Sequence, residues 1–290
     1  MMVLPPFDPA IFADNLLAYY AYAVVRPHAN LSDEPLLIEG IEPAYQVQSF
    51  VHADLQVMVS AVPLTEYEVD RLRERVQDIE WLEARAVAHQ RVLVQLMQYY
   101  TVVPLKFCTI YVGEERLRQA ITEYGDTFRA ALDRIEGCLE WGVKLFYDRA
   151  ALTTWAQQEV PKLRDLANTF NAASEGVRYM LSKRLQRATH EVVDDLMYND
   201  AQAIHQTLVA LVRASDRHKP PATQSNTANE PMVLNGAYLV AEAEYAAFTA
   251  AVEQVCTTYG PRGLRLELTG PWPAYSFVEP TEDVQEVVDG

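Results

Sequence analysis

Near its C-terminus the chain has a segment whose backbone has few accessible conformations, LRLELTGPWPAYSFV at residues 264–278. Leucines and polar residues alternate over 264–269, which predicts a strand with one apolar face. Gly270 can adopt a positive φ, whereas Pro271 and Pro273 fix φ and supply no N–H donor. The sequence therefore predicts a last strand that runs into a stiff turn.

Three aromatic residues occupy this turn and the residues after it. Trp272 lies between the two prolines, and Tyr275 and Phe277 follow with a period of two. Two interpretations stay open. Aromatic side chains beside strands are usually buried, and this reading is favoured. Alternatively, a proline-stiffened turn presents Trp272, Tyr275 and Phe277 to a protein partner at little entropic cost.

Composition excludes several classes of protein. The net charge of −16 argues against nucleic-acid binding, which needs a basic face. Cys108, Cys138 and Cys256 are too far apart for a zinc site, and we expect a reducing cytoplasm. No basic residue precedes Arg26, so we expect no signal peptide, and the longest apolar run (16–25) is too short to cross a membrane.

Hydrophobic periodicity predicts an α+β protein. We expect strands at 16–25, 44–50, 55–62, 101–111, 139–147, 232–240 and 264–269, and helices at 65–100, 114–135, 150–214 and 242–259. Asp78 is a candidate helix N-cap within the first helical stretch. Residues 220–231 read as a polar loop.

The same pattern divides the chain in two. With a boundary at Gly137, we expect an N-terminal α+β domain with a mixed sheet at 1–137 and a second α+β domain with long helices at 138–278. An acidic tail follows at 279–290.

No common catalytic or nucleotide-binding motif is present. Two weak candidate groups remain: Glu80 and Glu83 with His89, and His190 and Glu191 with Asp194 and Asp195. In both cases a solvated charged helix face, or a half-buried histidine, is favoured over a site. We predict no catalytic, cofactor-binding or metal-binding residues. The alternative is an enzyme with an unrecognised carboxylate and histidine site.

Seven segments in the same order resemble the gas vesicle GvpL/GvpF family. They are YYAYAVVRP (19–27), HADLQVMVSAVPL (52–64), DIEWLEARAVAHQRVL (78–93), VPLKFCTIY (103–111), EWGVKLFYD (140–148), MVLNGAYLV (232–240) and LELTGPWPAYSFV (266–278). Cys108 and Ala23 stand where the resemblance leads us to expect glycine, so the local packing there needs another explanation.

The resemblance implies a modified ferredoxin-like C-terminal sheet. It also implies a minor structural or accessory protein that acts in gas vesicle assembly in the cytoplasm. The implied partners are the hydrophobic major shell protein and other accessory proteins, without membrane, nucleic acid, cofactor or small-molecule substrate. The family has no established catalytic residues to transfer onto this chain.

Overall fold

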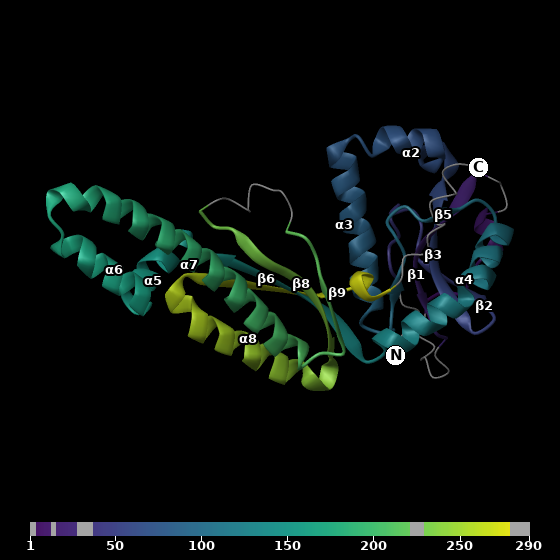
Figure 1. Cartoon of the computed structure of the whole chain (residues 1–290). Helices are drawn as coiled ribbons and strands as arrows, with labels where there is room; N and C mark the ends of the chain where they lie inside the picture. Colours follow the sequence, from purple (N-terminus) through teal and green to yellow (C-terminus); the bar gives the residue numbers. More distant parts are fainter. Residues whose placement is uncertain (1–3, 13–15, 28–36, 221–228, 279–290) are drawn as a thin grey trace. The chain divides into compact units, whose positions relative to one another are not determined.

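The computed structural model describes residues 4–12, 16–27, 37–220 and 229–278 (Figure 1). The acidic tail at 279–290 and residues 221–228 of the polar loop lie outside these ranges. The chain folds into two compact units. Unit 1 comprises Met1–Gly137 together with Trp272–Gly290, and unit 2 comprises Cys138–Pro271. Residues 272–278, which we expected in the second domain, belong to unit 1 instead.

Unit 1 is built on a five-stranded sheet in the order β2-β3-β1-β4, with β5 also paired to β1. Its elements are η1 (Pro9–Phe12), β1 (Leu17–Val25), β2 (Gln48–His52), β3 (Leu55–Pro63), α1 (Leu64–Tyr67), α2 (Val69–Arg75), α3 (Ile79–Leu96), β4 (Val103–Pro104), β5 (Ile110–Tyr111), α4 (Glu114–Ile135) and η4 (Tyr275–Phe277).

Strand β1 forms the centre of unit 1, and all but its first residue are buried. Tyr20 and Tyr22 belong to the core cluster that also contains Val92 and Leu93 of α3. Helix α4 contributes its own buried residues, and Figure 1 shows α3 and α4 on opposite sides of the β1–β3 pair. Because helices cover both faces, β1 reads as one continuous apolar run.

The sheet in unit 1 is antiparallel, and the expectation of a mixed sheet was wrong. β1 pairs antiparallel with β3, β4 and β5, and β2 pairs antiparallel with β3. β2 and β3 run antiparallel because Ala53 and Asp54 close a tight hairpin between them, in which Ala53 has a φ of 55°. Asp78 caps α3 as predicted, because its carboxylate accepts hydrogen bonds from the N–H groups of Glu80 and Trp81.

Unit 2 has a β-α-β-β-α-β succession and a four-stranded sheet in the order β7-β8-β6-β9. This is the succession of a split βαβ motif. Its elements are β6 (Cys138–Tyr147), α5 (Arg149–Glu159), α6 (Pro161–Ala172), α7 (Glu175–Val209), β7 (Ala214–Arg217), β8 (Met232–Ala241), η2 (Glu242–Glu244), α8 (Tyr245–Tyr259), η3 (Gly260–Arg262) and β9 (Leu264–Trp272). Strand β7 was not predicted, since its ASDR sequence carries no apolar alternation.

One face of the unit 2 sheet is packed against helices. Val143, Leu145 and Tyr147 of β6 belong to a single buried cluster with residues of α7 and α8. Gly236 of β8 leaves room on this face for a neighbouring ring, because a Cβ there would lie 2.8 Å from the ring of Tyr238. The glycine therefore serves close packing.

We predict that Gly236→Ala lowers the free energy of unfolding by about 1–3 kcal/mol, because the added methyl overpacks against Tyr238. Gly176→Ala in α7 is the matched control, since nothing lies within 4 Å of its Cβ position. Its stability should be unchanged or slightly higher. Chemical denaturation measures both variants, and equal stabilities would contradict the packing role of Gly236.

Candidate functional site

The candidate site is the C-terminal segment formed by residues 270–278. The strand does not end at Thr269 as predicted, because β9 continues to Trp272. Gly270 has the expected positive φ, 127°. The chain turns after Pro273, where the N–H of Tyr275 donates to the Pro273 carbonyl at 2.7 Å. A short 3-10 helix, not the expected period-two extension, then carries Tyr275 and Phe277.

The three aromatic residues of the segment have different environments. Trp272 is 42% exposed and Tyr275 is 39% exposed, whereas Phe277 is only 6% exposed. Arg134 of α4 donates a hydrogen bond to the Phe277 carbonyl at 3.3 Å. Phe277 therefore fixes the segment in unit 1 instead of presenting a surface, and Trp272 and Tyr275 are the two aromatic residues of the segment that solvent reaches.

The hydroxyl of Tyr275 is directed inward and joins the segment to α3. Its oxygen lies 3.0 Å from Nε2 of His89, and the hydroxyl donates to the Leu105 carbonyl at 3.2 Å. On the other side of the ring, Nδ1 of His89 lies 2.9 Å from the hydroxyl oxygen of Tyr20 on β1. The N–H of Cys108 donates to that same oxygen at 2.9 Å.

This geometry determines where each proton lies. Because the Tyr275 hydroxyl donates to the Leu105 carbonyl, its oxygen accepts from His89 Nε2–H. Nδ1 then carries no proton and accepts from the Tyr20 hydroxyl. The result is a continuous chain of hydrogen bonds from the Cys108 amide through Tyr20, His89 and Tyr275 to a backbone carbonyl. We call this chain the histidine link.

Burial keeps the imidazole of the histidine link neutral. His89 is 3% exposed, and desolvation lowers its pKa from 6.5 to about 4.

Cys108 has a left-handed backbone with φ of 63°, a conformation that favours glycine, the residue that the resemblance led us to expect there. That conformation accompanies the amide contact with Tyr20, and burial raises the pKa of the Cys108 thiol to about 12.

The two groups of histidine and acidic residues considered from the sequence are arranged differently in the structure. Glu80 and Glu83 are exposed, and the hydrogen bonds of the His89 ring go to tyrosine hydroxyls. His190 and Asp194 do come together, with Nε2 3.5 Å from a carboxylate oxygen, and Arg149 binds that same Asp194 at 2.7 Å. Within residues 4–278, gaps excepted, no cluster of three or more histidine, cysteine or acidic side chains could hold a metal.

Known proteins resemble this chain along nearly its whole length. A family profile described as gas vesicle synthesis protein GvpL/GvpF matches residues 18–279. The chain belongs to the GvpL/GvpF family. A gas vesicle protein L from Streptomyces sp. (strain CB03234) is 30% identical over 92% of this chain and 95% of its own length. A gas vesicle protein F from the same strain is 26% identical over 91% of this chain and all of its own length.

Two solved structures share the fold. The crystal structure of GvpF from Microcystis aeruginosa aligns with a TM-score of 0.62 over 90% of this chain and 99% of that one, at 20% identity. The crystal structure of GvpF from Anabaena sp. PCC7120 aligns with a TM-score of 0.64 over 92% and 98%, at 17% identity. The two-sheet α+β architecture is therefore that of GvpF.

Family membership implies a role in gas vesicle formation. The GvpL/GvpF proteins are structural or accessory proteins and not known enzymes. In the ranges that the structure describes, no helix is long and apolar enough to cross a membrane.

The histidine link had no signal in the sequence, since His89 and Tyr275 are separated by 186 positions.

We predict that the histidine link makes stability depend on pH. Between pH 6.5 and about 4 the unfolded chain binds a proton at His89 that the folded chain does not. The free energy of unfolding therefore falls by roughly 3 kcal/mol as the pH drops through this window, and His89 adds no further loss below it. Denaturation at pH 7 and at pH about 4.5 should show this loss in the natural chain.

His89→Gln does not titrate, so its stability should fall less over the same window. Equal pH dependence in the natural chain and His89→Gln would contradict a neutral His89 in the fold.

We also predict that Tyr275→Phe loosens the C-terminal segment. The change removes the hydroxyl between His89 and Leu105 and costs about 1 kcal/mol of local stability. Hydrogen exchange of a peptide covering 270–278 should become about fivefold faster. Tyr198→Phe on α7, at a 66% exposed side chain, is the control and should not change this exchange. Unaltered exchange in Tyr275→Phe would show that its hydroxyl does not hold the segment.

Proposed function

We propose that this protein acts in gas vesicle assembly by binding the hydrophobic major shell protein and other accessory proteins. It does so in the cytoplasm, as a chaperone-like or shell-associated component. Segments that are apolar and prone to form strands aggregate unless a partner covers them. A protein that adds such a segment to its own sheet, or covers its apolar side chains, prevents this.

The observation that supports the proposal is an edge strand that ends in an exposed aromatic residue. Among the described strands, β9 has β6 as its one neighbour in the sheet. An edge strand offers backbone N–H and C=O groups to an incoming strand. Its last residue, Trp272, is 42% exposed, and tryptophan is enriched among residues that dominate binding energy.

The residues after Trp272 restrict the backbone that carries its side chain. Pro273 fixes the backbone, and the histidine link fixes Tyr275 two residues later. A contact side chain with a fixed backbone loses less conformational entropy on binding. In this proposal Trp272 and the exposed part of Tyr275 contact the partner, while the buried Phe277 supports them.

We predict that Trp272→Ala weakens binding of the major shell protein by about tenfold or more. Pairwise binding of the purified proteins measures it, and circular dichroism with thermal melting checks that the variant is folded. Tyr198→Ala removes an aromatic side chain that is 66% exposed on α7 and should leave affinity unchanged. A folded Trp272→Ala chain that binds like the natural one would remove Trp272 from the contact surface.

A second measurement distinguishes the two forms of the proposal. Gas vesicles are purified, washed and probed for this chain with an antibody. A shell-associated component stays with the washed vesicles, whereas a transient chaperone is lost. Absence of binding to every shell and accessory protein in the pairwise test would contradict both forms.

A further inference from the structure

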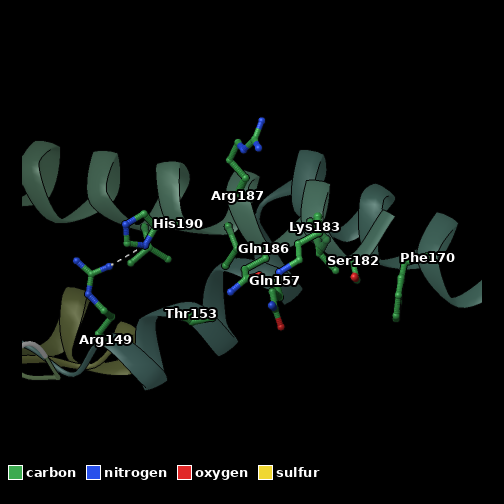
Figure 2. A pocket seen from close by; sticks show the side chains of 12 residues that line it. Arg149, Thr153, Gln157, Phe170, Ser182, Lys183, Gln186, Arg187 and His190 are labelled. Atoms are coloured by element: carbon green, nitrogen blue, oxygen red, sulfur yellow. Dashed lines mark hydrogen bonds between the residues drawn. The ribbon is translucent and has the colours of Figure 1, made fainter. Parts of the chain in front are cut away.

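A pocket of about 730 Å³ lies within unit 2 between α5 and α7 (Figure 2). Its size is typical of sites that bind a ligand or a short segment of chain. Arg149 and Gln157 come from α5, Lys183 and His190 come from α7, and Phe170 comes from α6. Figure 2 shows Arg149 and His190 together at one end and Phe170 at the other, with Lys183 between them.

The lining is cationic although the whole chain has a net charge of −16. Arg149, Lys183, Arg187 and His190 line the pocket, and no described carboxylate does. Arg149 is paired with Asp194 at 2.7 Å. Lys183 and Arg187 form no ion pair with any residue that the structure describes, and both also border a second pocket on α7. Unpaired cations gathered around a pocket attract an anionic ligand.

A buried hydroxyl in the same lining lacks a partner. Thr189 is 7% exposed, and its Oγ1 makes no hydrogen bond with any described residue. A threonine on a helix commonly satisfies its hydroxyl by donating to a backbone carbonyl one turn earlier. Leaving a buried hydroxyl unpaired costs stability, so Thr189 is explained if a ligand in the pocket supplies the missing acceptor.

The spacing of Lys183 and His190 indicates the shape of that ligand. Lys183 and His190 are seven residues apart on α7, which is about 10 Å along the helix axis. An elongated ligand fits this separation better than a compact anion such as inorganic phosphate. In an extended peptide alternate side chains share a face, and side chains two or four residues apart are separated by about 7 or 13 Å, a range that the long Lys183 side chain can span.

We propose that the α5–α7 pocket binds an extended acidic segment of a partner protein. One carboxylate binds Lys183, and at the Arg149–His190 end a second carboxylate accepts from the guanidinium N–H groups of Arg149 that Asp194 does not occupy. Thr189 donates a hydrogen bond to the segment, and Phe170 packs against its apolar stems. This binding site is separate from the contact surface at Trp272 and does not depend on it.

The probe is a fluorescent hexaglutamate peptide, titrated into the full-length protein at low ionic strength, with anisotropy as the readout. Lys183→Gln should weaken binding about tenfold, because it removes a charge-assisted hydrogen bond. Thr189→Val should weaken it several-fold without lowering the melting temperature, since it removes a hydroxyl that is unsatisfied in the unbound protein.

Arg164→Gln is the matched control. Arg164 lies on α6, carries the same charge as Lys183 and is absent from the pocket lining. Its loss should change hexaglutamate affinity by less than twofold. Trp272→Ala should also bind hexaglutamate normally, which separates this site from the shell-protein contact.

Three results would overturn the proposal. Hexaglutamate could fail to bind the natural chain, or Arg164→Gln could weaken binding as much as Lys183→Gln, which would indicate unspecific attraction. Inorganic phosphate could displace the peptide at equal concentration, which would indicate a site for a compact anion.

Discussion

A neutral imidazole between two tyrosine hydroxyls holds the C-terminal segment on unit 1. The direction of each hydrogen bond in the histidine link follows from its two ends, because the Cys108 amide can only donate and the Leu105 carbonyl can only accept. If Nδ1 of His89 carried a proton, the Tyr20 oxygen would accept hydrogen bonds from both His89 and the Cys108 amide. The hydroxyl hydrogen of Tyr20 would then have no acceptor. The attachment of the segment therefore requires that His89 stay uncharged, and burial ensures it.

This attachment makes unit 1 discontinuous in sequence. The chain leaves it at Gly137, forms unit 2, and returns at Trp272. The attachment of Tyr275 therefore depends on residues from α3, β1 and the loop after β4. Trp272 is the first residue of the returning segment and is exposed, whereas Phe277, five residues later, is buried.

Local patterns in the sequence predicted those elements whose burial is periodic. The helix expected at 114–135 is present with the same bounds, and Asp78 caps α3 as its position suggested. Pairing and long-range contacts were not predictable in this way. The stiff turn after 264–269 was predicted, but the 3-10 helix at Tyr275–Phe277 and the hydrogen-bond partners of Tyr275 on unit 1 were not.

The same limit applies to the candidate sites. His190 and Asp194 are one helical turn apart and were readily paired from the sequence, whereas Arg149 reaches them from another helix. His89 carried a weak signal for chemistry, and the structure gives it a structural role because its partners are hydroxyl groups. Phe277 was grouped with Trp272 and Tyr275 because all three are aromatic, and only the tertiary contacts separate them.

The pocket on α5 and α7 shows why net charge alone decides little about partners. Net charge governs long-range attraction, which is screened beyond roughly 8–10 Å at physiological salt. A long polyanion such as nucleic acid extends past the pocket and meets the acidic remainder of the chain, and the absence of nucleic-acid binding stays a prediction from composition. A short acidic segment that fits between α5 and α7 experiences mainly the local cations. An acidic protein can therefore repel nucleic acid and still select an acidic peptide.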